Sequence, residues 1–160
     1  MRARPRLPAT GRYATELGCF TNNRALPPGQ PTVAGYLAEA GYDTAYIGKW
    51  HLASDAEHNF REQPVPVERR GGYRDFWLAA DVLEFTSHPF EGHVFDGDGR
   101  QVDFTGYRPD RLTDMTLEYL DGRDWARPLY LFISHIEPHH QNDMHRFVGP
   151  EGAAERFAGY

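Results

Sequence analysis

The spacing of apolar and polar residues predicts two helix–strand units in this chain. In the first unit, Thr32 is a good helix N-cap and Gly41 occupies the position that follows a helix. The residues between them form one apolar stripe at helical spacing: Val33, Tyr36, Leu37 and Ala40. A short apolar strand over 42–47 comes next, and a helix over 109–120 then precedes an apolar run over 129–136. This order of elements predicts an α/β fold with parallel strands.

The second unit carries clear boundary signals. Pro109 suits the first turn of a helix, and Gly122 stands where the helix should stop. The predicted buried face of this helix consists of Leu112, Met115, Thr116, Tyr119 and Leu120. The run over 129–136 is apolar throughout, which is typical of a parallel strand that is buried on both faces.

The remaining segments are less periodic. Residues 1–31 are rich in Arg, Pro, Gly and Asn and are predicted to be a loop-rich start, and residues 53–72 are predicted to be a long surface loop. The apolar segment 76–85 fits either a strand or a short helix. The segments 93–95 and 101–104 flank a turn of Asp and Gly residues, which predicts a β-hairpin.

Composition limits the class of protein. A chain of 160 residues with 40% hydrophobic and 25% charged residues can form one globular domain. It has no apolar run near the roughly 20 residues that a membrane span needs, so no transmembrane segment is expected. The net charge of −6 argues against nucleic acid as a partner, because phosphate binding requires a basic face. A local cationic pocket for a small anion remains compatible with this charge.

The candidate chemistry follows the two predicted strands. Lys49 and His51 stand two residues apart just after the first strand, and His139 follows the second strand. In an α/β sheet, ligands bind in the crevice beyond the carboxyl ends of the strands. A cation and an imidazole on alternate positions there can point at one anion, so we expect Lys49, His51 and His139 to converge.

Three segments resemble a known family and occur in the family's order. Residues 41–52, Gly-Tyr-Asp-Thr-Ala-Tyr-Ile-Gly-Lys-Trp-His-Leu, resemble the second signature of the sulfatases. Residues 10–13, Thr-Gly-Arg-Tyr, resemble the sequence that follows the sulfatase nucleophile motif, and residues 137–143 resemble the family's later histidine loop. Residues 70–73 and 95–99 fit the connecting region of some bacterial members. The chain therefore resembles an arylsulfatase-like member of the alkaline-phosphatase superfamily.

This resemblance implies a fold, a reaction and residue roles. The fold would be alkaline-phosphatase-like, with a mostly parallel sheet flanked by helices, and the reaction would be hydrolysis of a sulfate monoester of a small molecule or a glycan. The complete enzyme would use a formylglycine nucleophile and a calcium ion. By match of motif, Lys49 and His139 would bind the sulfate, and His51 would hold or deprotonate the second hydroxyl of the nucleophile. Arg12 would order the nucleophile turn.

The sequence also departs from the family pattern. Counting back from Thr10 places the nucleophile at Met1, and residues 1–5 do not match the nucleophile motif. Cys19, the single cysteine, lacks the Pro and Arg that should follow a nucleophile and is interpreted as a small, partly buried residue. No metal ligands of the family are found, so residues 1–160 are predicted to be a partial catalytic domain, an interior fragment truncated at both ends and inactive alone.

One hypothesis explains the missing motif. If the reading frame is shifted by one base, suitable codons at the start give Cys-Ala-Pro-Val-Arg in the expected place. Residues at about 1–9 would then be out of frame, with Met1 an out-of-frame start. The genomic DNA upstream and across these codons tests this hypothesis.

Three alternatives stay open. The same cationic pocket suits a phosphonate or phosphate monoester hydrolase of the same superfamily. The chain could instead be a non-catalytic module that binds a sulfated glycan. It could also be a zinc-binding domain that uses imidazole and carboxylate ligands: His135, His139, His140, Asp143 and His145.

Overall fold

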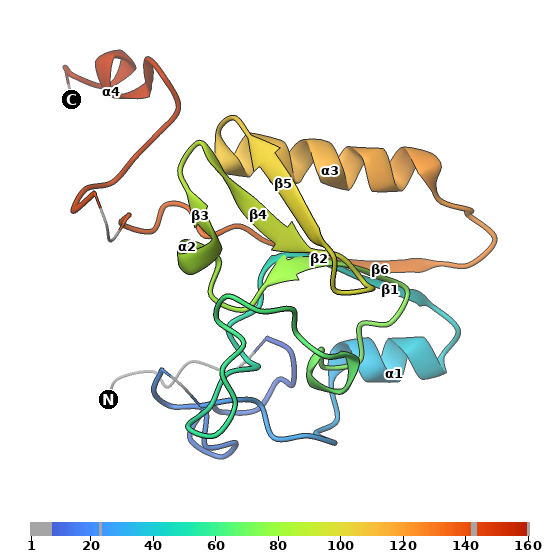
Figure 1. Cartoon of the computed structure of the whole chain (residues 1–160). Helices are drawn as coiled ribbons and strands as arrows, with labels where there is room; N and C mark the ends of the chain where they lie inside the picture. The colour runs from blue at the N-terminus through green and yellow to red at the C-terminus, as the bar shows by residue number, and fades with distance from the viewer. Residues whose placement is uncertain (1–7, 23, 142–143, 160) are drawn as a thin grey trace.

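The computed structural model describes residues 8–22, 24–141 and 144–159 of the chain. Figure 1 shows one sheet with helices on both of its faces. The elements in chain order are α1 (Val33–Glu39), β1 (Asp43–Lys49), η1 (Val67–Arg69), β2 (Phe76–Ala80), α2 (Leu83–Thr86), β3 (Ser87–His88), β4 (Glu91–Phe95), β5 (Gln101–Thr105), α3 (Arg108–Gly122), β6 (Leu129–Ser134) and α4 (Ala153–Arg156).

The sheet has six strands in the order β3-β4-β2-β1-β6, with β5 paired to β4. Strand β1 lies between β2 and β6 and runs parallel to both. Beyond β2 the sheet continues with the antiparallel strands β4, β5 and β3. The predicted α/β fold and the β-hairpin of β4 and β5 are therefore confirmed. The ambiguous segment 76–85 contains both predicted forms, because β2 is followed by the short helix α2.

The caps of α1 form as predicted. The Thr32 hydroxyl oxygen accepts a hydrogen bond from the backbone N–H of Gly35 at 2.9 Å, and Gly41 has a φ of +89° beyond the helix end. The predicted packing face is wrong. Tyr36 is 63% exposed and Val33 is 38% exposed, whereas Ala34 is buried against the sheet. The small Ala34 side chain allows this helix of 7 residues to approach the sheet closely, and that rotates the larger side chains outward.

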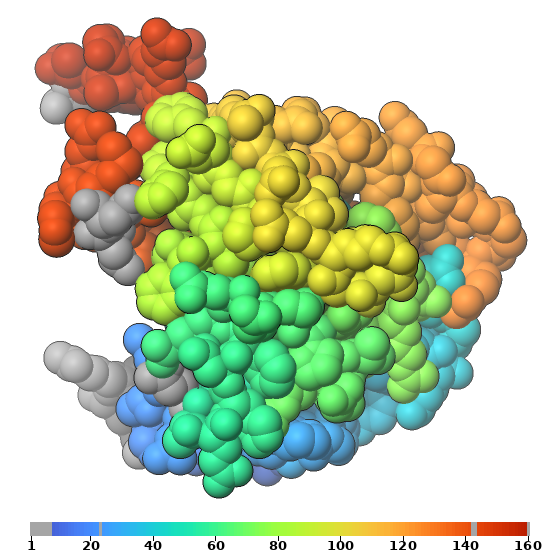
Figure 2. Space-filling model, viewed as in Figure 1, coloured from blue at the N-terminus to red at the C-terminus, as the bar shows by residue number. Residues whose placement is uncertain are grey.

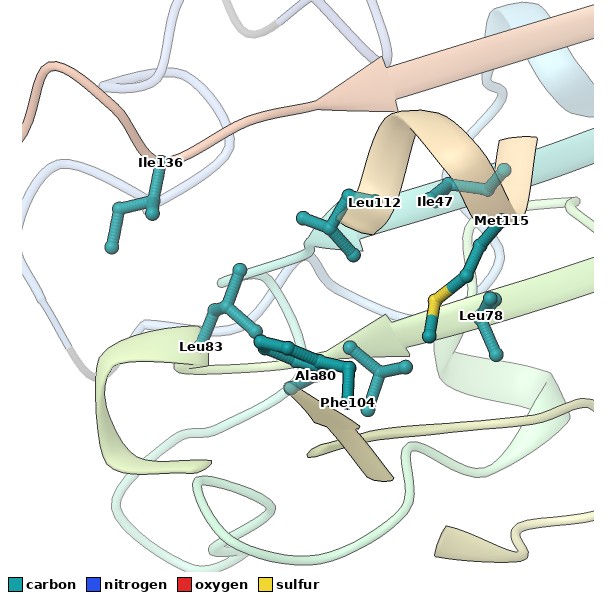
Figure 3. Packing of buried hydrophobic residues seen from close by; sticks show 9 residues of the cluster. Ile47, Leu78, Ala80, Leu83, Phe104, Leu112, Met115 and Ile136 are labelled. Carbon is teal, nitrogen blue, oxygen red and sulfur yellow. The ribbon is translucent and has the colours of Figure 1, made fainter. Parts of the chain in front are cut away.

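Helix α3 covers one face of the sheet and builds the main aliphatic core. Its buried residues Leu112 and Met115 pack against Ile47 from β1 and Leu78 from β2 (Figure 3). Leu83 of α2 joins the same cluster. Each such side chain contributes about 1.5–3 kcal/mol of burial free energy. The core therefore fixes the two central strands and α2 relative to one another.

The opposite face is covered by α1 and the loop over 53–72, and its core is aromatic. Tyr46 from β1 stacks on Trp77 from β2 and on Phe132 from β6, with ring centroids 5.3 and 5.6 Å apart. Trp50 and Tyr73 pack edge-on against Tyr46, at 5.0 and 4.9 Å. The predicted surface loop therefore also supplies buried residues, because its ends close over this aromatic cluster.

Strand β6 is less buried than its sequence predicted. Its residues are half-buried or exposed, and Ile133 is 41% exposed. The prediction of burial on both faces is wrong because, within the described residues, β6 is the edge of the sheet and has β1 as its neighbour on one side only. An edge strand offers unpaired backbone groups to other chains.

The segment 144–159, with α4, extends away from the sheet in Figure 1 and projects from the rest of the molecule in Figure 2. Phe147 and Phe157 in this segment are 72% and 63% exposed. Among the described residues, none of the helices is both long and apolar enough to span a bilayer.

Candidate functional site

The carboxyl ends of three parallel strands meet at one edge of the sheet. Gly48 of β1 pairs with Ser134 of β6, and Lys49 pairs with Ala80 of β2. A pocket of about 220 Å³ opens at this edge. Its lining combines polar residues at the end of β1, just beyond β1 and at the end of β6 with an aromatic wall. The lining residues are Lys49, His51, Ser134, Tyr46, Trp50, Tyr73 and Phe132, with Pro8, Ala9 and Leu52. Lys49 and His51 therefore line the same pocket at the carboxyl edge of the sheet.

Lys49 is held tightly at the end of β1. Its side chain is 15% exposed, and its Nζ donates a hydrogen bond to Oε1 of Glu84 at 2.5 Å. The hydroxyl of Tyr46 donates to the Lys49 carbonyl at 2.5 Å, which fixes the backbone at the same point. Lys49 is also the single lysine of the chain, whose other basic residues are arginines and histidines.

Glu84 is the partner that the sequence analysis missed. Its carboxylate is 7% exposed, and Oε2 is buried without a hydrogen-bond partner among the described residues. Burial acts to raise the pKa of Glu84, but the hydrogen bond and positive charge of Lys49 outweigh burial, and the pKa lies below its ordinary value. The Glu84 carboxylate is therefore charged at neutral pH. Glu84 stands in an apolar segment, and no pattern in that segment signals its role.

His51 follows Trp50 in an unusual backbone conformation. Its φ is +55°, and its N–H donates to the carbonyl of Asp81 at 2.7 Å. The side chain is half-buried. Burial lowers the pKa of His51, and the positive charge of Lys49 lowers it further. The imidazole is therefore neutral at pH 7 and can accept a proton.

Asp81 ties the His51 turn to the end of β2. Its carboxylate is fully buried and accepts the backbone N–H groups of Ala53 and Ser54, each at 2.9 Å. Together with the hydrogen bond from His51, these contacts hold three backbone N–H groups of the turn. Its position directly after an apolar strand was a signal that could have marked Asp81 for attention.

His139 lies on the loop that follows β6. Its side chain is exposed, and its Nδ1 is 2.6 Å from the carbonyl oxygen of His140. The loop is anchored next to it, because the buried Arg108, which is 2% exposed, pairs with Glu137 at 2.6 Å. His139 is not part of the pocket lining described above. Its convergence with Lys49 and His51 stays a prediction.

Comparison with known proteins decides the family. A sequence profile of the Sulfatase family matches residues 8–158, nearly the whole chain. The chain belongs to the sulfatase family. It is 30% identical over 160 residues to the uncharacterized sulfatase YidJ of Escherichia coli (strain K12), a match that covers 94% of this chain and 30% of that protein. It is 31% identical over 131 residues to the N-acetylglucosamine-6-O-sulfatase of Bacteroides thetaiotaomicron, covering 81% of this chain and 20% of that protein.

Solved sulfatase structures share the fold. One, from work on glycosaminoglycan metabolism by Bacteroides thetaiotaomicron, superimposes with a TM-score of 0.67 at 24% identity, over 82% of this chain and 31% of that chain. Another was solved in complex with its substrate D-glucosamine-2-N,6-O-disulfate and superimposes with a TM-score of 0.63 at 28% identity, over 86% of this chain and 26% of that chain. The alkaline-phosphatase-like fold is thereby confirmed. The chain spans less than a third of the length of the relatives named above.

Arg12 lies in the part of the sulfatase chain that precedes α1. It is exposed, its Nη1 donates to Oε1 of Gln30 at 3.3 Å, and its Nε lies 3.5 Å from Glu16. Met1, the predicted position of the nucleophile, and most of the stretch at about 1–9 lie outside the described residues. A supporting role for Arg12 stays a prediction.

The described residues of this sulfatase contain no group of three or more His, Cys, Asp or Glu side chains that could hold a metal ion. They therefore lend no support to the zinc alternative, whose Asp143 lies outside the described residues, and they do not fit a calcium site. Cys19 is half-buried, its thiol donates to the carbonyl of Ala25 at 3.1 Å, and burial raises its pKa. A raised pKa disfavours the thiolate that nucleophilic attack needs.

Proposed function

We propose that this chain supplies the sulfate-binding part of the active site of a sulfuric ester hydrolase. The observation that supports the proposal most directly is the pocket at the carboxyl edge of the sheet, where the ammonium of Lys49 lies beside the neutral imidazole of His51. Lys49 presents fixed positive charge to the sulfate oxygens in a partly water-excluded site, where charge stabilisation is strong. His51, with its lowered pKa, accepts a proton from a nucleophile hydroxyl.

The proposal extends to His139 and Arg12. His139 contacts the sulfate or the bridging oxygen of the ester, and the anchored loop after β6 carries it to the same edge of the sheet. Arg12 orders the turn that bears the nucleophile. The family resemblance implies a formylglycine nucleophile and calcium in the complete enzyme. The described residues do not fit a calcium site, so we assign no step through the ion.

The proposed substrate is a sulfate ester of a small molecule or a glycan. Two of the related proteins are named for, or bound to, sulfated amino sugars. The aromatic wall of the pocket is compatible with this choice, because a flat apolar side chain such as the half-buried Phe132 can pack against the carbon skeleton of an alcohol. A phosphate or phosphonate monoester is the competing substrate, since Lys49 suits either anion.

Sulfate binding by the 160-residue chain tests the proposal. We expect calorimetric titration with inorganic sulfate to give saturable binding that Lys49→Met weakens about tenfold or more, because a hydrogen bond to a charged group contributes about 1.5–3 kcal/mol. Arg111→Met, in an exposed ion pair that does not line the pocket, is the matched control and should leave binding unchanged. Equal binding by the Lys49→Met variant would refute the assignment.

Two further measurements separate the alternatives. We expect no turnover of an aryl sulfate by this chain with or without calcium, because its sequence lacks the nucleophile motif. Calcium-stimulated turnover by this chain would contradict that expectation. Tighter binding of phosphate than of sulfate would favour the phosphate monoester alternative.

A further inference from the structure

The Lys49–Glu84 pair has an unusual balance of contacts. Removing both charges from water is costly, and the cost is recovered only when the hydrogen bonds of both groups are satisfied. Here Oε1 of Glu84 accepts from Lys49, but Oε2 is buried and has no partner among the described residues. A buried carboxylate oxygen without a donor is destabilising. A purely structural ion pair would not be expected to retain it.

Glu84 is also placed on a fixed support. It lies in α2, whose neighbouring residues Leu83 and Thr86 are buried in the core, and the hydroxyl of Ser87 donates to the Leu83 carbonyl at 2.6 Å. Lys49 is fixed at the other side by its place in β1 and by the hydrogen bond from Tyr46. The backbone positions of Glu84 and Lys49 are therefore fixed relative to each other.

The hydrogen-bond capacity of Lys49 explains what this arrangement can do. An ammonium has three N–H donors. Glu84 occupies one of them, and no other side chain among the described residues accepts from Lys49. Since Lys49 lines the pocket, the remaining donors are available to an anion that enters it.

We propose that Glu84 is a positioning residue of the sulfate site, which holds the ammonium of Lys49 in place so that its two remaining N–H donors face the pocket. This inference rests on the proposed function only for the identity of the anion, which is sulfate. The role of Glu84 toward Lys49 is supported by the hydrogen bond between the two residues, by the burial of both side chains and by the place of Glu84 in α2.

Glu84 also acts on His51 through its charge. Burial and Lys49 lower the pKa of His51, and the negative charge of Glu84 opposes both. Asp81 opposes them as well, whereas Arg61 adds to the lowering. Removing the charge of Glu84 without changing its shape should therefore move the His51 titration to lower pH.

The test compares Glu84→Gln with wild type, and Asp114→Asn, at an exposed ion pair of α3, is the matched control. Because Lys49 is the single lysine, acetylation by acetic anhydride followed by peptide mass mapping reports its accessibility as a free amine. We expect Glu84→Gln to raise the Lys49 acetylation rate about tenfold or more, in line with loss of a charged hydrogen bond. We expect Asp114→Asn to leave it unchanged.

Titration of His51 by NMR, assigned with His51→Gln, is the second measurement. We expect its midpoint to fall in Glu84→Gln and to stay constant in Asp114→Asn. If Glu84→Gln folds with wild-type circular dichroism and changes neither the acetylation rate nor the His51 midpoint, the inference is wrong. If Glu84→Gln does not fold, Glu84→Asp keeps the charge but lengthens the contact, and it should raise the acetylation rate while leaving the His51 midpoint closer to wild type. An unchanged acetylation rate in Glu84→Asp would also overturn the inference.

Protection by sulfate separates this inference from the proposed function. In the wild-type chain, saturating inorganic sulfate should slow acetylation of Lys49 because the anion covers the free donors. Lack of protection would refute sulfate binding at Lys49 but would leave the Glu84 result intact. If sulfate protects Lys49 but Glu84→Gln changes neither the acetylation rate nor the His51 midpoint, the inference about Glu84 is wrong and the proposed sulfate binding stands.

Discussion

Replacement of Trp50 by alanine tests whether this residue supports the site through packing. Trp50 is 5% exposed. Its ring packs edge-on against those of Tyr46, Tyr73 and Trp77 at centroid distances of 5.0, 5.9 and 5.7 Å. Its Nε1 donates to the carbonyl of Arg69 at 3.0 Å. Truncation of a buried tryptophan to alanine costs about 3–5 kcal/mol. That is a large part of the roughly 5–15 kcal/mol by which domains are stable.

Urea denaturation followed by circular dichroism measures this loss directly. We expect Trp50→Ala to lower the free energy of unfolding by about 3–5 kcal/mol, and its melting temperature to fall by roughly 2–4 °C for each kcal/mol lost. Trp50→Phe keeps most of the ring and should lose less than half as much. Where Trp50→Ala remains folded, its sulfate affinity should stay within a few-fold of wild type. A loss below about 1 kcal/mol, the typical effect of an ordinary substitution, would refute the packing argument.

Three other predictions follow from the same description. Gly48→Ala should destabilise the β1–β6 pairing strongly in urea denaturation, because Gly48 has a φ of +107° and an added Cβ would overlap the carbonyl of Ser134; wild-type stability would contradict this. Because the pKa of His51 is lowered in the folded chain, the unfolded chain takes up a proton near pH 6.5 before the folded chain does. The free energy of unfolding should therefore fall as the pH drops below 6.5, and it should fall less in His51→Gln. Identical pH profiles for the two proteins would refute the assignment. Because β6 is the edge strand of the sheet among the described residues, we expect the chain to aggregate at high concentration and Ile133→Lys to raise its soluble concentration, measured by size-exclusion chromatography; a wild-type chain that stays monomeric would count against this.

Local signals in the sequence were sufficient for most of the fold. The Thr32 cap, the turn between β4 and β5 and the proline at the start of α3 each depend on residues close together in the chain. They were predicted because their chemistry is local. Helix α3 buries Leu112 and Met115 as its periodicity predicted.

Predictions from the sequence failed where the structure depends on how many tertiary neighbours an element has and on which residues those neighbours are. An apolar run such as 129–134 has the same pattern in a central strand as in an edge strand, so the exposure of Ile133 could not be foreseen. The Lys49–Glu84 pair joins residues 35 positions apart. Which carboxylate meets Lys49 depends on the register of β1 against β2, and no periodicity encodes that register. Asp81 is a different case, because its position directly after an apolar strand was a usable signal.

The parallel pairing of β1 with β6 also has a consequence during synthesis. Asp43 of β1 lies opposite Leu129 of β6, so β1 cannot pair with β6 until residues that follow it by 86 positions have been synthesised. Contacts between distant parts of a chain form slowly, and strand edges left open meanwhile are prone to aggregation. On the ribosome, one edge of β1 stays unpaired until residues 129–134 have emerged. The pocket is lined by Ser134 as well as Lys49, so its wall cannot be complete in a nascent chain before residue 134 has been made.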